Sequence, residues 1–138
     1  MMMVTLNRDV MSIVKEQDVI PFRNRLKEYA VKVGMSLVNQ TKIVTAASEL
    51  VRNMLKYANG GKVYIEVVSK GRENGIRLIF EDQGPGIPNI EQAMKDGFST
   101  GRSLGLGLPG AKRLMSEFDI KSNVGKGTTV TVVKWKNG

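Results

Sequence analysis

The segment EDQGPGIPNIEQAMKDGFSTGRSLGLGLPGAKRLMSEF, residues 81–118, contains nearly half of the chain's 15 glycines and three of its four prolines. Both residue types interrupt helices and strands, so no regular element can run through most of this segment. Connections longer than about 12–15 residues are uncommon in compact domains and are usually functional or disordered. The patterns GFST and GLGLPG within the segment favour function over disorder. The fold must therefore place its regular elements on both sides of a long functional connection.

The chain has 138 residues, which suits one domain, and we expect residues 1–138 to form it. Its 21 Lys and Arg against 13 Asp and Glu give a formal charge of +8, which favours an anionic partner. It has no signal-type apolar core and no apolar run of about 18 residues, so we expect a cytoplasmic protein without membrane contact. Cysteine and histidine are absent, which excludes disulfides, thiolate chemistry, catalytic imidazoles and a phosphoaccepting histidine within the chain.

Regular elements are indicated on both sides of the glycine-rich segment. Apolar spacing predicts helices over residues 19–33, 37–58 and 109–118. The second helix would bury Ile43, Ala47, Leu50 and Met54, and Asp18 would cap the first. Alternation predicts strands over residues 10–14, 62–68, 76–80, 119–123 and 128–135, with the second and third paired as a hairpin. This order predicts an α+β fold, a two-layer sandwich with helices on one face of a mixed, mostly antiparallel sheet.

Three polar residues follow one strip of the second predicted helix. Glu49 and Asn53 are four residues apart, and Lys56 follows three residues later, so the three side chains lie beside the apolar face. A carboxylate can orient a hydroxyl and accept its proton, an amide oxygen can bind Mg²⁺, and a lysine can neutralise phosphate oxygens. The same residue types are ordinary on a solvated helix face, so the strip alone does not establish a site.

Two glycine patterns could approach a ligand. Asp82 follows a predicted strand and precedes Gly84 and Gly86, which let backbone approach a flat ligand while the carboxylate accepts a hydrogen bond from an exocyclic amine. A sharp turn uses the same residues. Gly105 and Gly107 lead into the third predicted helix, whose first N–H groups could bind phosphate, although these glycines could also serve as a hinge. Neither pattern matches a Walker motif or a dinucleotide fingerprint.

Four segments occur in the order of a known set of nucleotide-site motifs: ELVRNMLKY (49–57), DQGPG (82–86), GLGLPG (105–110) and GKGTTVTV (125–132). They resemble the motifs of the gyrase, Hsp90, histidine-kinase and MutL (GHKL) ATPase superfamily. The resemblance spans nearly two thirds of the chain. It implies a two-layer α/β sandwich of the Bergerat type, with ATP and Mg²⁺ as cofactors.

The resemblance also implies roles for single residues. Asp82 would bind the adenine amino group with support from Thr128, and Asn53 would hold Mg²⁺. Glu49 would act as the base or the orienting carboxylate, and Lys56 would lie near the phosphates. The remaining nucleotide contacts would come from Gly84, Gly86, Gly105, Leu106 and Gly107. Residues 87–107 would form a lid over ATP, which accounts for their glycine content.

The branch of the superfamily follows from what the chain lacks. Gyrase, MutL and chaperone relatives carry a further domain, for which 138 residues leave no length, and histidine kinases need a phosphoaccepting histidine. The segments SELVRN, DGFSTG and GLPGAKRLMSEF are similar to bacterial switch serine/threonine kinases of the RsbT type. That type implies phosphoryl transfer to a STAS-domain partner in a stress-signalling or sigma-factor switch, with a PP2C-type phosphatase or a sigma factor as a second partner. Arg102 and Ser103 stand where the type would lead us to expect more glycine.

Two other classes stay open. The sibling RsbW and SpoIIAB type sequesters a sigma factor with ATP bound, and negligible phosphoryl transfer would favour it. A nucleic-acid-binding protein would account for the charge of +8, but the chain has only eight aromatic residues and no stripe in which they alternate with basic ones. We therefore expect no nucleic-acid partner.

Overall fold

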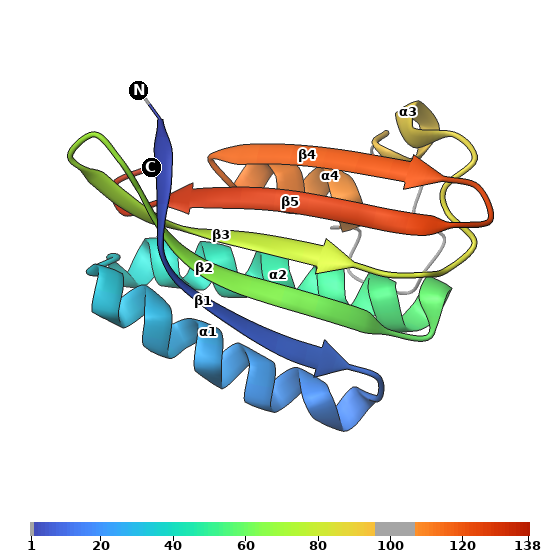
Figure 1. Cartoon of the computed structure of the whole chain (residues 1–138), viewed down its shortest axis with the longest axis horizontal. Helices are drawn as coiled ribbons and strands as arrows, with labels where there is room; N and C mark the ends of the chain where they lie inside the picture. The colour runs from blue at the N-terminus through green and yellow to red at the C-terminus, as the bar shows by residue number, and fades with distance from the viewer. Residues whose placement is uncertain (1, 96–106) are drawn as a thin grey trace.

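The computed structural model describes residues 2–95 and 107–138. Its elements, in chain order, are β1 (Met3–Ile13), the short 3-10 helix η1 (Glu16–Asp18), α1 (Val19–Val33), α2 (Leu37–Ala58), β2 (Gly61–Lys70), β3 (Glu73–Glu81), α3 (Ile90–Ala93), α4 (Gly107–Leu114), β4 (Glu117–Asn123) and β5 (Gly127–Trp135). These strands form one sheet in the order β1-β2-β3-β5-β4 (Figure 1).

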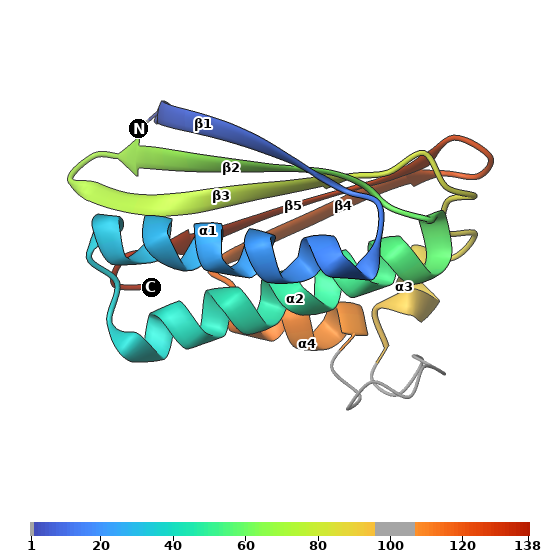
Figure 2. The ribbon, with the colours of Figure 1, turned by 90° about the horizontal axis from the view of Figure 1, so that it is seen from below.

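The sheet and the helices form two layers. Figure 2 shows α1, α2 and α4 on one face of the sheet, and no helix of the described residues lies on the other face. Every pair of neighbouring described strands is antiparallel. The predicted two-layer α+β fold is therefore confirmed, and the sheet expected to be mixed is antiparallel throughout its described pairs.

Helix α2 is the longest helix among the described residues, and local signals define both of its ends. The hydroxyl of Ser36 accepts a hydrogen bond from the N–H of Asn39 at 3.1 Å, which caps the start of the helix. The helix ends at Asn59, which adopts the left-handed conformation with φ of 60°. The predicted buried face is confirmed, since all four of its members are buried: Ile43, Ala47, Leu50 and Met54.

The prediction that the Asp18 side chain caps the start of α1 is wrong. The carboxylate of Asp18 accepts hydrogen bonds from the N–H groups of Val14 and Lys15, before the helix, at 2.9 and 3.1 Å. A side chain caps a helix when its own backbone is extended, but η1 runs directly into α1 and leaves Asp18 with helical φ of −77° and ψ of −16°. Asp18 therefore stabilises the turn between β1 and α1.

Two predicted boundaries differ most from the structure. Strand β1 starts at Met3, well before residue 10, because it pairs with β2 from Met3 to Ile13, with one irregularity between Thr5 and Asn7. The predicted helix over 109–118 ends at Leu114, and β4 begins at Glu117. Phe118 and Ile120 belong to β4 and pack on the core. The strand therefore includes residues 117 and 118, which the helical pattern had assigned to the helix.

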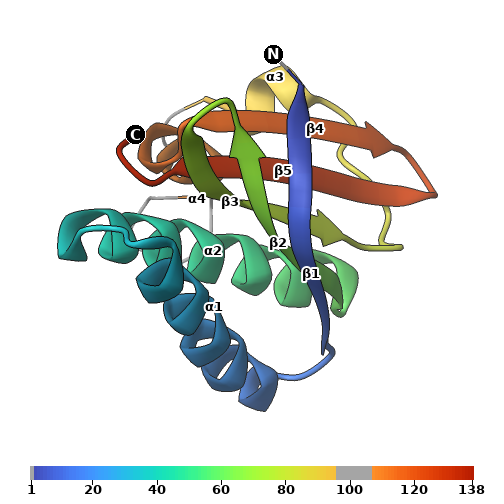
Figure 3. The same cartoon turned by 60° about the vertical axis from the view of Figure 1, so that its left-hand side comes forward.

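The hydrophobic core lies between the covered face of the sheet and the three helices (Figure 3). Phe22 of α1 meets Phe80 of β3 edge to face, with ring centroids 6.4 Å apart. Asp9 of β1 binds Arg25 and Tyr29 of α1, which attaches the edge strand to the helix layer.

One end of the molecule brings three elements together: the end of β3, the start of β5 and the C-terminal half of α2. Among the described residues, no helix has the length and apolar character needed to cross a membrane.

Candidate functional site

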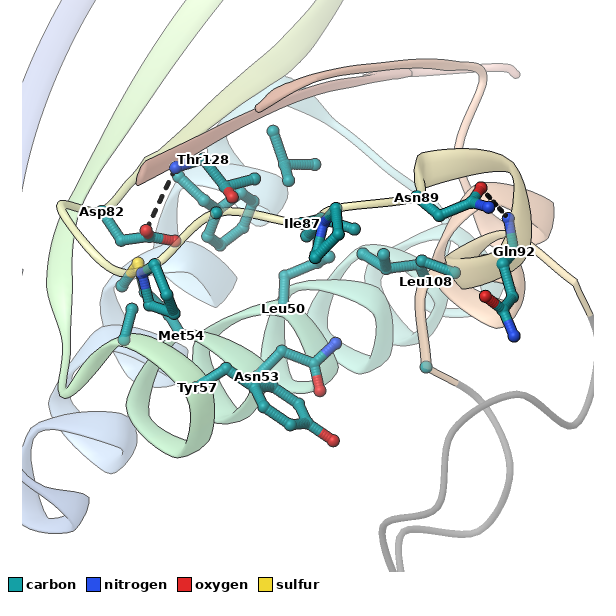
Figure 4. A pocket seen from close by; sticks show the side chains of 18 of the residues that line it. Leu50, Asn53, Met54, Tyr57, Asp82, Ile87, Asn89, Gln92, Leu108 and Thr128 are labelled. Atoms are coloured by element: carbon teal, nitrogen blue, oxygen red, sulfur yellow. Dashed lines mark hydrogen bonds between the residues drawn. The ribbon is translucent and has the colours of Figure 1, made fainter. Parts of the chain in front are cut away.

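A cavity of about 470 Å³ lies at the end of the sheet where β3 stops and β5 begins (Figure 4). Its walls come from α2, the loop after β3, α3, the start of α4 and the start of β5. Much of the lining is apolar and includes Leu50, Met54, Phe80, Ile87, Leu108 and Val130. A cavity of this size with a few polar groups in an apolar lining is typical of a small-molecule site.

Asp82 is the acidic residue of this cavity, and the backbone holds it firmly. Its Oδ1 accepts hydrogen bonds from the N–H of Gly84 at 2.9 Å and from the N–H of Thr128 at 3.1 Å. Its own N–H donates to the carbonyl oxygen of Thr128 at 3.0 Å. Figure 4 shows the second carboxylate oxygen directed away from this bond, on the cavity side. That oxygen can accept a hydrogen bond from a ligand without disturbing the anchored one.

The glycines after β3 allow close packing around Asp82. A Cβ atom on Gly84 would lie 2.5 Å from the Cβ of Ala58, at the end of α2, so a side chain cannot fit there. Gly86 has a φ of +79°, and a Cβ would lie 2.4 Å from the carbonyl oxygen of Asn123. Gly86 lines the cavity, whereas Gly84 is not among the lining residues.

The three residues of the α2 strip occupy different surroundings. Asn53 lines the cavity, and its side chain forms no hydrogen bond with any described residue. Glu49 is 7% exposed and does not line the cavity; its Oε1 lies 3.9 Å from Nη1 of Arg52. Lys56 is exposed and lies outside the lining, with Nζ 5.1 Å from the ring of Tyr57. The structure thus brings Asn53 together with Asp82 and leaves the two charged residues beside the cavity.

The predicted phosphate loop and lid are described only in part. Gly107 lines the cavity at the start of α4, but Gly105 and Leu106 lie outside the described residues, as do Arg102 and Ser103. Of the lid predicted over 87–107, residues 87–95 and 107 are described. They include the short helix α3, whose start is capped by a hydrogen bond from the Gln92 N–H to the Asn89 side chain at 3.0 Å.

Several cavity residues were missed from the sequence. Asn89 and Gln92 belong to the segment NIEQ, and an asparagine three residues before a glutamine is a helix-start signal that could have revealed α3. Tyr57 lines the cavity and is 53% exposed. It belongs to the ELVRNMLKY motif, but the motif did not predict a role for it. Ser122 lies behind Thr128 at a hydroxyl–hydroxyl distance of 2.8 Å, and no sequence pattern marks it.

The arrangement of the four motifs agrees with one family of nucleotide-binding proteins. Residues 38–137 match the model of the histidine kinase-, DNA gyrase B- and HSP90-like ATPases. The chain belongs to this family. The resemblance predicted from the motifs is therefore confirmed.

Individual relatives refine this assignment. The chain is 46% identical to the serine/threonine-protein kinase RsbT of Bacillus subtilis, over 89% of this chain and 92% of that protein. It is 34% identical to an anti-sigma F factor of Anoxybacillus flavithermus, over 77% of this chain and 76% of that protein. The expected RsbT-type kinase class is thus supported over nearly the whole chain, and the anti-sigma type matches at lower identity.

A solved structure gives a further comparison of the fold. The RsbU and RsbW domains of a Mycobacterium tuberculosis protein match with a TM-score of 0.65 at 23% identity, covering 93% of this chain and 31% of that chain. The chain therefore spans about a third of that longer protein. At this identity the match supports the two-layer fold alone.

Proposed function

We propose that this chain is an ATP-dependent serine/threonine protein kinase that phosphorylates a STAS-domain regulatory protein in a bacterial partner switch. The observation that carries the proposal is the meeting of Asn53 and Asp82, from separate elements, in one cavity. The chain that contains them is 46% identical to a serine/threonine kinase over 89% of its length. An amide oxygen can bind Mg²⁺ and a carboxylate can accept a hydrogen bond from a base, so this pair suits a nucleotide site.

The adenine base would bind at the end of the cavity that holds Asp82. The free carboxylate oxygen would accept a hydrogen bond from the amino group of the base, while the anchored oxygen keeps the side chain in place. The apolar residues Met54, Ile87 and Val130 line the same cavity and suit the flat faces of a base. This wall would exclude water and strengthen the hydrogen bond to Asp82.

The donor set fits Mg²⁺ that arrives with ATP. Magnesium usually keeps several waters and binds one or two protein oxygens together with substrate phosphates. Asn53 supplies one neutral amide oxygen, and within the described residues no group of three or more acidic, cysteine or histidine side chains could hold a metal unaided. When bound, the ion would neutralise charge on the β- and γ-phosphates. Lys56 and the first N–H groups of α4 could contribute further positive potential.

Glu49 would orient the hydroxyl of the partner. In the transfer step, the hydroxyl oxygen bonds to the γ-phosphorus, the bond from that phosphorus to the bridging oxygen breaks, and ADP leaves with the bond's electron pair. The hydroxyl proton passes to the Glu49 carboxylate. Because the transition state is loose, correct positioning contributes more than basicity. The support for this role is the position of Glu49 on α2, one helical turn before Asn53, which lines the cavity.

Two partners beyond the substrate belong to this proposal. A PP2C-type phosphatase or a sigma factor could bind alternately with the STAS-domain protein, as the partner-switching class implies. The main competing function is sequestration of a sigma factor with ATP bound. It is favoured by the anti-sigma F factors that match at 34% and 38% identity.

A direct transfer assay tests the proposal. The chain is mixed with ATP labelled on the γ-phosphate, Mg²⁺ and a STAS-domain protein, and label on the partner is measured over time. We expect Mg²⁺-dependent labelling of a serine or threonine. Tight binding of a sigma factor with no label on any STAS-domain protein tested would instead support the anti-sigma function.

A further inference from the structure

Ser122 lies at the end of β4, behind the cavity wall, and is not among the residues that line the cavity. Its hydroxyl accepts a hydrogen bond from the N–H of Ile87 at 2.7 Å and lies 2.8 Å from Oγ1 of Thr128. It also lies 3.2 Å from the carbonyl oxygen of Gly127, to which it can donate. Because Ile87 and Thr128 both line the cavity, one hydroxyl joins two of its walls from behind.

The direction of the Thr128 hydroxyl follows from the number of protons in this network. Each hydroxyl carries one proton and two lone pairs. If Ser122 donates to Gly127, its lone pairs can accept from both Ile87 and Thr128, so all three contacts are hydrogen bonds. If Ser122 donates to Thr128 instead, the bond to Gly127 is lost. The arrangement with more hydrogen bonds turns the Thr128 proton toward Ser122 and leaves a Thr128 lone pair for the cavity.

This arrangement makes one end of the cavity rich in acceptors. The free oxygen of Asp82 is an acceptor, and Thr128 lies beside it at the same end of the cavity (Figure 4). An exocyclic amino group carries two N–H donors and matches such an end, whereas a carbonyl oxygen would face acceptors only. Adenine carries an amino group at position 6, and guanine carries an oxo group there.

We propose that Ser122 is a positioning residue that sets the base specificity of the site by keeping Thr128 an acceptor toward the cavity. Its effect is to favour adenine over guanine nucleotides. The inference rests on the proposed function, because it takes the ligand at Asp82 to be the base of ATP. Ser122 touches no ligand in this scheme and acts through Thr128 and Ile87.

Three variants separate this role from a general effect on packing. Ser122→Ala removes the acceptor for the Thr128 proton, which is then free to turn toward the cavity. Ser122→Thr keeps a hydroxyl at the same position. Thr129→Val removes a hydroxyl from the next residue of β5, whose side chain lies on the opposite face of the sheet, and serves as the matched control.

The dissociation constants of ATP and GTP, measured by calorimetry with Mg²⁺, give the decisive ratio. We expect Ser122→Ala to weaken ATP binding about five- to tenfold without weakening GTP binding, so that the preference for ATP falls by about the same factor. Ser122→Thr and Thr129→Val should keep the wild-type preference. Backbone amide exchange gives a readout without nucleotide, since the Ile87 N–H should exchange faster in Ser122→Ala than in the other two variants.

The outcomes distinguish this inference from the proposed function. Equal loss of ATP and GTP affinity in Ser122→Ala, or no loss of either, would overturn the specificity role. Unchanged Ile87 exchange in that variant would contradict the network itself. Failure of the wild-type chain to bind ATP would count against the proposed function, whereas wild-type binding with an unaltered ATP preference in Ser122→Ala would count against Ser122 alone.

Discussion

The two ends of the cavity differ in how many of their polar groups already have partners. At the β3–β5 end, Asp82 receives two backbone hydrogen bonds, and Ser122 connects Ile87 to Thr128. On the α2 side, the Asn53 side chain has no hydrogen bond to a described residue. Glu49, which lies beside the cavity and not in its lining, has a single ion pair near the upper limit of distance, at 3.9 Å from Arg52.

This difference matches the two tasks of a kinase site. The base keeps one shape throughout the reaction, so a rigid set of hydrogen bonds can be built for it in advance. The phosphates, metal and partner hydroxyl arrive together and change bonding, so the groups that meet them need unoccupied hydrogen-bonding capacity. We therefore expect substitutions at the β3–β5 end to affect nucleotide binding and those on α2 to affect transfer.

Glu49→Gln tests most sharply whether the two sides of the site have different tasks. It should separate phosphoryl transfer from the binding of ATP. The amide is nearly isosteric but cannot receive the hydroxyl proton, and removal of a general base typically costs about 10²–10⁴ in rate. ATP and partner affinities should stay within a few-fold of wild type, because the other end of the cavity is intact. Labelling of the partner and calorimetry on one preparation measure all three quantities. Glu28→Gln, on the exposed side of α1, is the control, and transfer at the wild-type rate in Glu49→Gln would remove Glu49 from the proposed chemistry.

Asp82→Asn should have the largest effect on binding itself. The oxygen of the new amide must take the place of Oδ1, which accepts from Gly84 and Thr128, so the NH₂ group faces the cavity. A donor then meets the amino donors of adenine, and we expect ATP affinity to fall at least about 100-fold. Calorimetric titration measures the loss. Glu81→Gln, at the preceding residue, should bind ATP normally, and equal behaviour of the two variants would contradict the adenine assignment.

Much of this two-ended site was predictable because strong patterns carry it. The 4-3-4 spacing of Ile43, Ala47, Leu50 and Met54 gave the orientation of α2, and thereby the placement of Asn53 beside its apolar face. The alternation in residues 76–80 gave a strand that ends just before Asp82. Both patterns are local, since each depends on residues within one element.

The contacts of Ser122 at the β3–β5 end were not predictable, because they join elements distant in sequence. Ser122 meets Thr128 only through the pairing of β4 with β5, and meets Ile87 across 35 residues. A serine in a strand carries no signal of such a role. In the same way, the polar residues of β1 gave no strand pattern before residue 10, and tertiary pairing with β2 determines its length.

Asn53→Ala tests whether the unpartnered amide on α2 serves the metal. We expect the gain in ATP affinity on adding Mg²⁺ to fall about tenfold, together with the transfer rate, while metal-free ATP binding through Asp82 changes little. Titrations with Mg²⁺ and with a chelator measure the two affinities. Asn24→Ala, exposed on α1, is the control. If Asn53→Ala lost metal-free ATP binding, Asn53 would contribute to base binding like the residues of the β3–β5 end. The proposed division of tasks between the two sides would then be contradicted.

Gly86 and Gly125 form a matched pair for the rigidity of the β3–β5 end. Their φ angles are +79° and +81°, but a Cβ on Gly86 would lie 2.4 Å from the carbonyl of Asn123, whereas Gly125 has nothing within 4 Å. Gly125→Ala should cost about 1–2 kcal/mol of unfolding free energy, for the backbone alone. Gly86→Ala should lower the free energy of unfolding by more than this. It should also weaken ATP binding several-fold, because the cavity loop must move to make room for the methyl group. Urea unfolding and calorimetry measure both effects, and equal stability losses would mean that the loop accommodates the methyl group.

Asp9→Asn gives the smallest expected effect and shows whether lost stability alone lowers ATP affinity. Burial works against ionisation of Asp9, but hydrogen bonds from Arg25 and Tyr29 and the charge of Arg25 hold its pKa below the ordinary value of 3.8. Because the folded pKa is the lower one, the ion pair's stabilisation is present above pH 3.8 and is lost as the pH falls through the folded pKa.

At pH 7 we expect Asp9→Asn to lower the free energy of unfolding by about 1 kcal/mol or less, with ATP affinity unchanged, because Asp9 does not line the cavity. Urea unfolding of both forms across the acid range should show the difference shrinking below pH 3.8. If ATP affinity fell with stability in this variant, the losses expected for Gly86→Ala could no longer be assigned to the cavity loop.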